Sequence, residues 1–379
     1  MGKQKLYITT TIPESLVFFC GQIQYLSSEF NITVVSSPGV RLKTFGEKEN
    51  CNTYPILMKR GIAPIRDFIG LCHFILLFVR QHPDIVHGNT PKASFLSMLA
   101  AYVTGIKTRI YMCHGLRYQG CTGLMRKLLI NMERISCLCA TDVFCVSRGL
   151  MDQLLLDKIC SKKKLSIILN GSINGIDLNR YDRKNLVSSQ QLKNQLNLPQ
   201  QNFIFLFVGR IVKDKGIEEL ISAFCRLQKQ YSTLSLLLVG KYEAINPITE
   251  EVKNIIETNH SIHWVGSQAD VRPFYGCSDV MVLPSYREGF GMVLMEACAM
   301  DVPCITTDII GCNEIIVNGQ NGLVIPKQDS DALYEAMKYM YEHPQERLAM
   351  ASCARKTITS RYRQQDVWKA ALDTYKALG

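Results

Sequence analysis

Two glutamates in the second half of the chain, Glu288 and Glu296, flank a short turn that reads Gly289, Phe290, Gly291. Carboxylates accept hydrogen bonds from sugar hydroxyls, so one of these acids could hold a sugar ring and the other a ribose. The turn leads into a segment with helical spacing, and the free N–H groups at a helix start attract phosphate or hydroxyl oxygens. The segment is therefore a candidate site for a phosphorylated sugar, although solvated glutamates on an ordinary turn would show the same spacing.

A second candidate segment contains Arg210 and Lys215, which follow an apolar run typical of a buried strand. An arginine can clamp a diphosphate with two hydrogen bonds, while a lysine acts as a point charge. An ordinary basic surface turn is the alternative. Lys213 lies in the same turn.

Two of the seven histidines come at or just after the end of an apolar run. His114 ends one such run and opens a loop, which would place it at the carboxyl edge of a parallel sheet. His87 ends another run, and we interpret it as a hydrogen-bonded packing residue rather than a site residue.

Short apolar runs alternate with helical patterns from end to end, which predicts an α/β fold of parallel sheets. We expect strands at residues 6–10, 32–36, 84–87, 109–113, 143–146, 165–169, 203–208, 234–239, 262–265, 280–283, 303–306 and 323–325. Helices are expected between them, with the clearest patterns at residues 91–103, 124–138, 292–300, 344–360 and 364–378. Candidate residues that follow these strands would meet at the carboxyl edge of each sheet.

The length of 379 residues indicates two domains rather than one core. We predict an N-terminal domain at residues 1–180 and a C-terminal domain at residues 181–360. The polar stretch 179–201 reads as a linker followed by an opening helix, and residues 361–379 as a final helix.

The Glu-x7-Glu pattern within Glu-Gly-Phe-Gly, together with the Gly-Arg and Lys-Gly elements around Arg210 and Lys215, resembles the retaining glycosyltransferases of family 4. The resemblance covers nearly the whole chain and is strongest over residues 203–325. It implies the GT-B fold, which is two doubly wound Rossmann-like domains facing across a cleft, with the final helix packing back on the first domain. By this resemblance, residues 1–180 would be the acceptor-side domain and residues 181–360 the nucleotide-sugar-binding domain. Within the family, the subgroup of capsule and lipid-linked oligosaccharide transferases is most similar.

The resemblance also implies roles for individual residues. Arg210 and Lys215 would bind the donor diphosphate, Glu288 with the turn 289–291 would bind the sugar, and Glu296 would bind the ribose. Gly266 lies where the family seats the nucleobase. His114 resembles the family's position beside the donor sugar, so the expected catalytic residues are His114, Arg210, Lys215 and Glu288.

The sequence departs from the family after its first strand. Family members often have a Gly-Gly turn there, whereas this chain has Thr10-Thr11-Ile12-Pro13. Amides at a helix N-terminus and the hydroxyl of Thr11 or Ser15 could substitute for that turn. No Gly-x-Gly-x-x-Gly fingerprint occurs, which argues against a dinucleotide oxidoreductase.

We expect neither a metal nor a cofactor. Asp329 and Asp331 could be misread as a metal motif, but their position before a helical pattern predicts a helix cap. Phosphate charge would be balanced by arginine and lysine instead.

Composition bears on the partners of the protein and on its cellular compartment. The net charge of +10 is concentrated in residues 1–185, which contain 24 basic and 12 acidic residues, so the first domain is expected to face something anionic. The fifteen cysteines show no metal-binding spacing and indicate a reducing compartment. The most apolar stretch, residues 68–79, is too short to span a bilayer and reads as a buried helix. We expect a cytoplasmic protein, peripheral on the cytoplasmic face of the inner membrane.

A membrane-docking surface is predicted around the helix of residues 124–134, where basic residues accompany an apolar face, although an amphipathic core helix has the same pattern. The expected reaction is transfer of a hexose or N-acetylhexosamine from a UDP-sugar to a polyprenyl-diphosphate-linked saccharide in bacterial surface glycan synthesis. The alternatives are a soluble acceptor, a UDP-sugar 2-epimerase of the same fold, or a nucleic-acid-binding protein. The last is disfavoured because the basic residues are not interleaved with stacking aromatics, so no nucleic-acid partner is expected.

Overall fold

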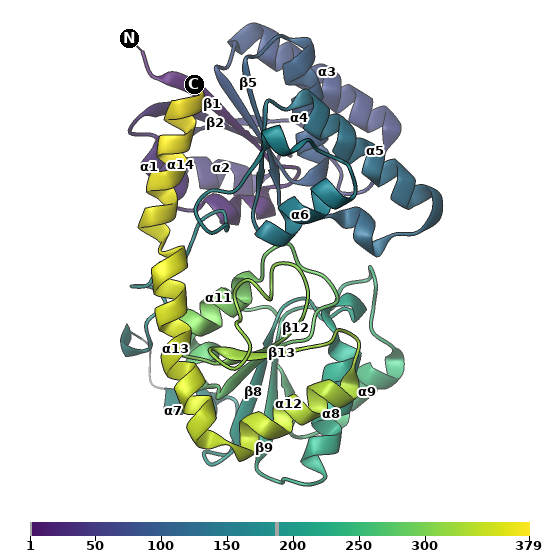
Figure 1. Ribbon diagram of the computed structural model, residues 1–379, viewed down its shortest axis with the longest axis vertical. Helices are drawn as coiled ribbons and strands as arrows, with labels where there is room; N and C mark the ends of the chain where they lie inside the picture. The colour runs from purple at the N-terminus through teal and green to yellow at the C-terminus, as the bar shows by residue number, and fades with distance from the viewer. Residues whose placement is uncertain (1, 186–188) are drawn as a thin grey trace. The chain divides into compact units, whose positions relative to one another are not determined.

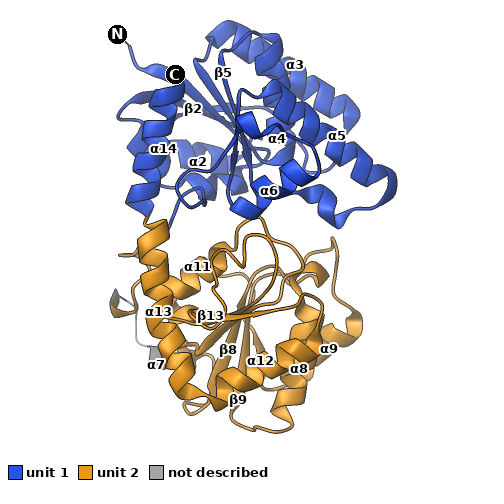
Figure 2. Cartoon of the chain, viewed as in Figure 1, with its two compact units in different colours: residues 1–175, 364–379 blue, residues 176–363 orange. Residues whose placement is uncertain are grey.

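The computed structural model describes residues 2–185 and 189–379, and the chain forms two compact units (Figures 1 and 2). The first unit runs up to Gly175 and also includes Gln364–Gly379, while the second is Ile176–Arg363. The chain thus passes from one unit to the other at residues 175/176 and 363/364, a few residues from the boundaries proposed after residues 180 and 360.

A seven-stranded parallel sheet forms the centre of the first unit, in the order β3-β2-β1-β4-β5-β6-β7. Its strands are β1 (Gln4–Thr9), β2 (Phe30–Ser36), β3 (Asn52–Pro55), β4 (Ile85–Asn89), β5 (Thr108–Cys113), β6 (Asp142–Cys145) and β7 (Leu165–Ser166). Strand β3 was not predicted, because it is a short edge strand whose residues are exposed or half-buried and show no apolar run.

The helices of the first unit are α1 (Gln22–Leu26), α2 (Val40–Glu49), α3 (Pro64–Gln81), α4 (Pro91–Val103), α5 (Gly123–Cys139), α6 (Arg148–Leu156) and α14 (Gln364–Leu378), with short 3-10 turns at Pro13–Phe19, Arg117–Gly120 and Lys162–Lys164. The final helix α14 packs against α1. Its Trp368 indole donates to Asn174 Oδ1 (2.6 Å), and the Thr108 hydroxyl donates to the backbone oxygen of Leu378 (2.9 Å).

The second unit contains a six-stranded parallel sheet in the order β10-β9-β8-β11-β12-β13. Its strands are β8 (Phe203–Val208), β9 (Leu234–Val239), β10 (Ile262–Trp264), β11 (Val280–Leu283), β12 (Cys304–Thr307) and β13 (Gly322–Ile325). The central strands are almost continuously apolar because a parallel sheet with helices on both faces buries both sides of each strand.

Seven helices surround this sheet within the described residues: α7 (Ser189–Gln195), α8 (Ile217–Gln228), α9 (Glu250–Thr258), α10 (Arg272–Cys277), α11 (Met292–Ala299), α12 (Ser330–Glu342) and α13 (Pro344–Tyr362), with 3-10 turns at Arg183–Asn185 and Lys213–Lys215. The predicted linker 179–201 belongs to this unit, and its residues 186–188 lie outside the described part of the chain. The cap prediction is confirmed, since Asp329 precedes α12 and its carboxylate accepts from Ala332 N (2.8 Å).

Both sheets have the same relative strand order, with a reversal of direction between the first and fourth strands. Doubly wound sheets bind ligands outside the carboxyl ends of the strands at this switch point. It lies between β1 and β4 in the first unit and between β8 and β11 in the second. The loops that follow these four strands are therefore where the fold itself predicts a site.

Helix α3 corrects one expectation. The apolar stretch 68–79 was predicted to be a buried helix, but only one face of α3 is buried, including Phe74, Leu77 and Phe78, while Phe68 is 65% exposed. The reason is that α3 packs mainly against α4, so the opposite face of α3 is left exposed. Within residues 2–185 and 189–379, no helix combines the length and apolar character that crossing a bilayer requires.

Candidate functional site

The switch point of the second unit brings Lys215 and Glu288 together. Lys215 follows β8 and Glu288 follows β11, and their side chains form an ion pair between Nζ and Oε1. Gly216 makes this approach possible, because it has φ +70° and a Cβ there would lie 2.1 Å from the backbone oxygen of Pro284. A glycine is therefore required where the two loops touch.

The Glu288 carboxylate also accepts a hydrogen bond from Ser285. The buried Ser285 hydroxyl donates to Glu288 Oε1 (2.9 Å), and the Thr307 hydroxyl donates to the backbone oxygen of Ser285 (2.5 Å). Both partners of the ion pair are 15% exposed. Lys215 still has donors that Glu288 does not use, and Glu288 Oε2 has no hydrogen bond to any described residue.

A second ion pair joins the same two loops. Arg287 contacts Asp214 Oδ2 through Nε (3.1 Å) and Nη2 (2.7 Å), and Tyr286 N donates to the backbone oxygen of Asp214 (2.9 Å). Three consecutive positions after β11, Tyr286, Arg287 and Glu288, thus contact the loop after β8. This bracing fixes the separation of the two segments that the sequence singled out.

Arg210 lies in the same loop as Lys215 but has a different partner. Its Nη1 contacts Glu243 Oε2 at 2.9 Å, and its side chain is 50% exposed. Glu243 follows β9, whose end approaches that of β8 so closely that a Cβ on Gly240 would lie 1.7 Å from the backbone oxygen of Gly209. The structure therefore places Arg210 beside the end of the adjacent strand β9, with half of its side chain exposed.

The turn 289–291 offers two backbone donors rather than three. Gly291 N donates to the backbone oxygen of Gly311 (3.0 Å), because the loop after β12 packs against the turn. Among the described residues, the N–H groups of Gly289 and Phe290 have no partner. The predicted contact from the Gly291 amide is thus already taken by Gly311, and Gly291 acts as the residue before α11.

Glu296, in α11, is held by two tyrosines. Tyr181 donates to Oε1 (3.0 Å) and Tyr275 to Oε2 (2.9 Å). Burial raises the pKa of Glu296, and the tyrosine hydrogen bonds partly oppose that rise. Because each carboxylate oxygen can accept a second hydrogen bond, this arrangement orients Glu296 without exhausting it.

Gly266 lies at the end of the segment after β10, and its carbonyl accepts from Gly240 N (2.8 Å). It has φ +68° with open space where a Cβ would be. Within the described residues, no group of three His, Cys, Asp or Glu side chains lies close enough to share a metal ion.

His114 belongs to the first unit, where it follows β5. Asn89 at the end of β4 donates through Nδ2 to the backbone oxygen of His87 (3.2 Å), so its Oδ1 faces His114 Nε2 at 2.9 Å. An amide oxygen only accepts, so Nε2 of His114 carries the proton and Nδ1 is left as an acceptor. Burial lowers the pKa of His114 to about 4, which makes the imidazole neutral at pH 7.

His87 is a packing residue, as interpreted from the sequence. It is buried in β4, its Nδ1 lies 2.6 Å from the Tyr375 hydroxyl of α14, and its ring stands at right angles to that of Phe19. Burial lowers its pKa to about 3, with a smaller contribution from nearby His114.

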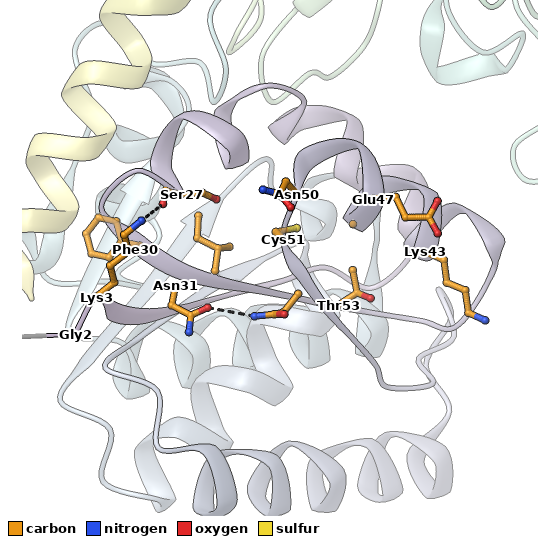
Figure 3. Close-up of a pocket in the computed structure, with 13 residues that line it drawn as sticks. Gly2, Lys3, Ser27, Phe30, Asn31, Lys43, Glu47, Asn50, Cys51 and Thr53 are labelled. Carbon is orange, nitrogen blue, oxygen red and sulfur yellow. Dashed lines mark hydrogen bonds between the residues drawn. The ribbon is translucent and has the colours of Figure 1, made fainter.

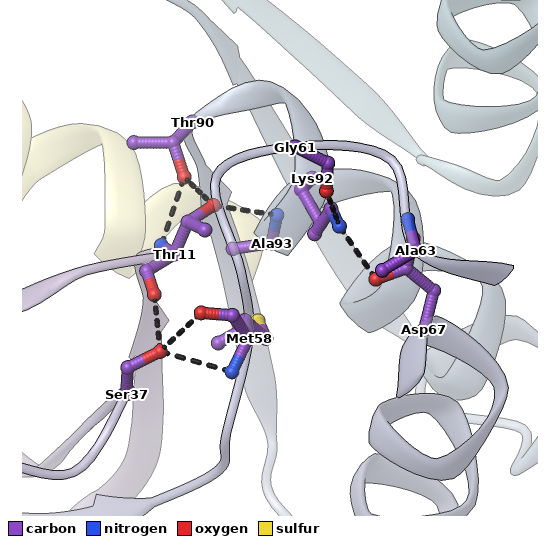
Figure 4. A network of polar contacts seen from close by, with 9 residues as sticks. All are labelled: Thr11, Ser37, Met58, Gly61, Ala63, Asp67, Thr90, Lys92 and Ala93. Atoms are coloured by element: carbon purple, nitrogen blue, oxygen red, sulfur yellow. Dashed lines mark hydrogen bonds and ion pairs between the residues drawn. The ribbon is translucent and has the colours of Figure 1, made fainter. Parts of the chain in front are cut away.

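Hydroxyl groups fill the switch point of the first unit (Figure 4). Thr11 Oγ1 lies 2.7 Å from Thr90 Oγ1, Thr11 N donates to the same Thr90 oxygen (3.0 Å), and Ala93 N donates to Thr11 Oγ1 (3.2 Å). Thr90 has φ +67°, an uncommon conformation for a β-branched residue. The Thr11 hydroxyl, proposed as a substitute for the Gly-Gly turn, is thus already engaged.

A polar cavity of about 770 Å³ lies elsewhere in the first unit (Figure 3). Its lining includes Lys3, Asn31 and Asn52, which stand at the amino ends of β1, β2 and β3. Ligands of doubly wound folds bind at the opposite, carboxyl ends. We therefore do not assign the cavity to the candidate site despite its size.

Several contacting residues were missed from the sequence, namely Ser285, Glu243, Tyr181, Tyr275 and Asn89. Ser285 lies three positions before Glu288 in the same loop. Each of the other four contacts a predicted site residue that is distant in the sequence. A serine at that spacing in a turn was the one local signal available, whereas the others depend on how the strands are ordered.

Comparison with known proteins agrees with the fold and the motifs. Residues 23–180 match the family model described as Glycosyltransferase Family 4, and residues 188–357 match the one described as Glycosyl transferases group 1. The chain is 33% identical over 376 residues to the capsular polysaccharide biosynthesis glycosyltransferase CapM of Staphylococcus aureus, which covers 99% of this chain and 97% of that protein.

A second relative is the Escherichia coli UDP-Gal:alpha-D-GlcNAc-diphosphoundecaprenol alpha-1,3-galactosyltransferase, 24% identical over 79% of this chain and 77% of its own. Among solved structures, HepE of Anabaena in complex with UDP-glucose superposes with a TM-score of 0.80 at 17% identity, covering 98% of this chain and 99% of that one. The structural likeness concerns the fold, which is the predicted GT-B fold of two Rossmann-like units. The family matches and the full-length relative together show that the chain belongs to glycosyltransferase family 4 and is a glycosyltransferase.

Proposed function

We propose that this glycosyltransferase transfers a hexose or N-acetylhexosamine from a UDP-sugar to a polyprenyl-diphosphate-linked saccharide, with retention of the anomeric configuration, in bacterial surface glycan synthesis. The observation that carries the donor assignment is the contact of Lys215 and Glu288 at the switch point of the second unit. A cation and a carboxylate at the carboxyl ends of adjacent strands suit a ligand that has both a diphosphate and a sugar.

In the proposed donor complex, Lys215 and Arg210 bind the diphosphate. Lys215 keeps donors that Glu288 does not occupy, and Arg210 is held by Glu243 along one side only. Each charge-assisted hydrogen bond contributes about 1.5–3 kcal/mol. These two cations would balance the charge that develops on the departing nucleotide, so the proposal involves no metal and no cofactor.

The two glutamates would bind the sugar and the ribose of the donor. Glu288 Oε2, which has no partner among the described residues, would accept from a sugar hydroxyl, while the amides of Gly289 and Phe290 would donate to the ligand. Glu296, oriented by Tyr181 and Tyr275, would accept from the ribose, and Gly266 would seat the base.

Retention requires the acceptor hydroxyl to attack from the face that the nucleotide leaves. A phosphate oxygen of the leaving group would take the proton within an oxocarbenium-like ion pair, and the protein would stabilise the charge and orient the reactants. Neutral His114, with Nδ1 free to accept, is proposed to hold a hydroxyl of the reacting sugars.

Two relatives support the acceptor class, because one is named for capsular polysaccharide biosynthesis and the other for a diphosphoundecaprenol-linked acceptor. A lipid-linked acceptor requires a membrane, so we propose a peripheral protein on the cytoplasmic face of the inner membrane. Supporting this, the face of α5 predicted to dock is exposed, with Leu124 83% and Leu128 44% accessible beside Arg126 and Lys127. The described part of the chain contains no disulfide, which suits a reducing compartment.

The test is a panel of UDP-sugars with a polyprenyl-diphosphate-linked sugar acceptor, and NMR of the anomeric configuration in the product. Glu288→Ala and Lys215→Ala should each lower turnover at least about 100-fold, which corresponds to one or two lost charge-assisted bonds. The matched control is Lys213→Ala, in the same turn but paired with Glu218 (3.4 Å) and 49% exposed, and it should retain activity.

Equal activity of wild type, Glu288→Ala and Lys215→Ala would refute the site. Inverted product would refute retention, and complete loss of turnover on chelation of divalent ions would refute the metal-independent route. Interconversion of free UDP-sugars without an acceptor would favour the 2-epimerase, and transfer only to water-soluble saccharides would favour the soluble-acceptor alternative.

A further inference from the structure

The outer face of α3 exposes an apolar stripe. Ile65, Phe68 and Ile69 are 80%, 65% and 49% exposed, and Leu76 and Val79 are 44% and 51% exposed. Positions 65, 69, 72, 76 and 79 recur at intervals of four and three, so they form one line along the helix. The loop before α3 adds exposed Leu57 and Ile62. A continuous apolar face of this kind on a surface helix marks an interaction site.

The same surface is basic. Lys59, Arg60, Arg66 and Arg80 are all exposed, and none of them takes part in an ion pair with a described residue. Asp67 is the only acidic residue between Asn50 and Asp84, and its carboxylate contacts buried Lys92 (2.5 Å). The exposed residues of this region therefore present positive charge without compensation.

The start of α3 is held firmly (Figure 4). Asp67 also accepts from Ala63 N (2.9 Å), and Lys92 donates to the backbone oxygen of Gly61. Earlier in the loop, Met58 N donates to the Ser37 hydroxyl (2.9 Å). The apolar side chains are thus presented on a fixed loop and helix, which join the carboxyl edge of the sheet where β3 ends.

We propose that this surface, defined as residues 57–62 and the outer face of α3 and called the α3 surface, docks in the plane of a bilayer containing anionic phospholipid. An apolar stripe flanked by cations is the pattern of an interfacial helix. The inference rests on the proposed function in one respect: docking would place the enzyme at the membrane in which the proposed lipid-linked acceptor is embedded. His114 follows β5 and the loop 57–62 follows β3, so His114 and this loop of the α3 surface both lie at the carboxyl edge of one sheet.

Charge selects lipid over a second copy of the chain. Arg66 and Arg80 lie at the two ends of the stripe, so a symmetric pairing of two α3 surfaces would bring like charges together. Anionic headgroups would instead attract each of them, at roughly fivefold in affinity per basic residue.

The experiment measures binding of the full-length protein to vesicles of phosphatidylcholine with 30% phosphatidylglycerol and to vesicles of phosphatidylcholine alone. The apolar variant Ile65→Ser/Phe68→Ser/Ile69→Ser should weaken binding to anionic vesicles at least about tenfold. Its matched control is Leu156→Ser/Ile245→Ser/Leu348→Ser, three residues that are 75%, 80% and 65% exposed on other elements, and this control should bind as wild type does.

The charge variant Lys59→Ala/Arg60→Ala/Arg66→Ala should weaken binding roughly 100-fold and remove the preference for anionic vesicles. Its control is Lys158→Ala/Lys162→Ala/Lys163→Ala, three exposed lysines of the same unit. Tryptophan fluorescence through thermal unfolding checks that each variant folds. Unchanged vesicle binding by both α3 variants would overturn the inference, as would a concentration-dependent dimer that the apolar variant abolishes.

Failure of the inference and failure of the proposed function give different results. If the acceptor class is wrong, wild type binds anionic vesicles through the α3 surface but does not glycosylate any polyprenyl-diphosphate saccharide. If the α3 inference is wrong, the apolar variant transfers sugar to vesicle-embedded acceptor as fast as wild type. The inference predicts slower transfer to the embedded acceptor and unchanged transfer to a short-chain, water-soluble acceptor analogue.

Discussion

Glu133 in α5 is a buried carboxyl with no cationic partner among the described residues, and replacing it should change how stability depends on pH. It is 5% exposed, and the hydroxyl of Tyr111 in β5 donates to its Oε2. Burial raises the pKa of Glu133 from 4.5 to about 7, with the Tyr111 hydrogen bond opposing the rise. Because the folded state holds the proton more tightly than the unfolded state, stability falls as pH rises between these two values.

The size of this loss follows from the two pKa values. A difference of about 2.5 pKa units corresponds to roughly 3 kcal/mol, nearly all of it lost between pH 4 and pH 8. Glu133→Gln keeps an oxygen acceptor for Tyr111 but carries no charge at any of these pH values. The variant should therefore lack this slope and exceed wild type in free energy of unfolding by about 3 kcal/mol at pH 8, but by only a few tenths at pH 4.

The assay is urea unfolding of the first unit at pH 4, 5, 6, 7 and 8. The chain has two tryptophans, Trp264 in the second unit and Trp368 in α14, so a Trp264→Phe background lets Trp368 fluorescence report the first unit alone. Glu47→Gln, which alters an exposed carboxylate of α2, is the control and should leave the wild-type slope unchanged. Parallel stability curves for wild type and Glu133→Gln from pH 4 to pH 8 would refute the reasoning.

Three further predictions concern the site. Long-range proton–nitrogen NMR of His114 should show the proton on Nε2, and Asn89→Leu should redistribute it towards Nδ1; a wild-type proton on Nδ1 would contradict the assignment through Asn89. Gly216→Ala should lower the free energy of unfolding of the second unit more than Gly266→Ala does in urea unfolding. Both glycines have nearly equal φ, but only a Cβ at Gly216 would meet a backbone oxygen. Equal losses of about 1–2 kcal/mol for the two variants would contradict this prediction. Ser285→Ala should lower kcat about tenfold or more at little cost in stability, since it removes the hydroxyl that orients Glu288, and unchanged kinetics would exclude this role.

The sequence predicts elements well where the local signal is strong. Strands β8, β9 and β11 have the predicted bounds because each is a continuous apolar run buried on both faces. The same reasoning fails for β3, which has no apolar run, and for β7, which stops at Ser166 because the chain turns soon afterwards, with Leu169 at φ +51°. The apolar stretch predicted a helix where α3 lies, but it could not show which face of α3 is buried. That face is set by the packing of α3 against α4.

For the candidate site, sequence reasoning found the positions but not their partners. Arg210, Lys215 and Glu288 could be placed on loops after strands, and the strand order then brings Lys215 and Glu288 into contact. The partners of Arg210, Glu296 and His114 come from other strands and helices, so no local pattern contains them. Likewise, only the packing of the loop after β12 reveals that the Gly291 amide is occupied.

The two switch points share one topology but differ in charge, and this difference bears on how a diphosphate could be bound. In the first unit the loops after β1 and β4 hold Thr11, Thr90 and Asn89, and nearby His114 is neutral because burial lowers its pKa to about 4. In the second unit the loop after β8 holds both Arg210 and Lys215. Hydroxyls that already satisfy one another cannot balance a diphosphate, so we infer that the phosphate charge is neutralised by the second unit alone. A chain that lacks the family's Gly-Gly turn should therefore depend on these two cations more strongly than relatives that have it.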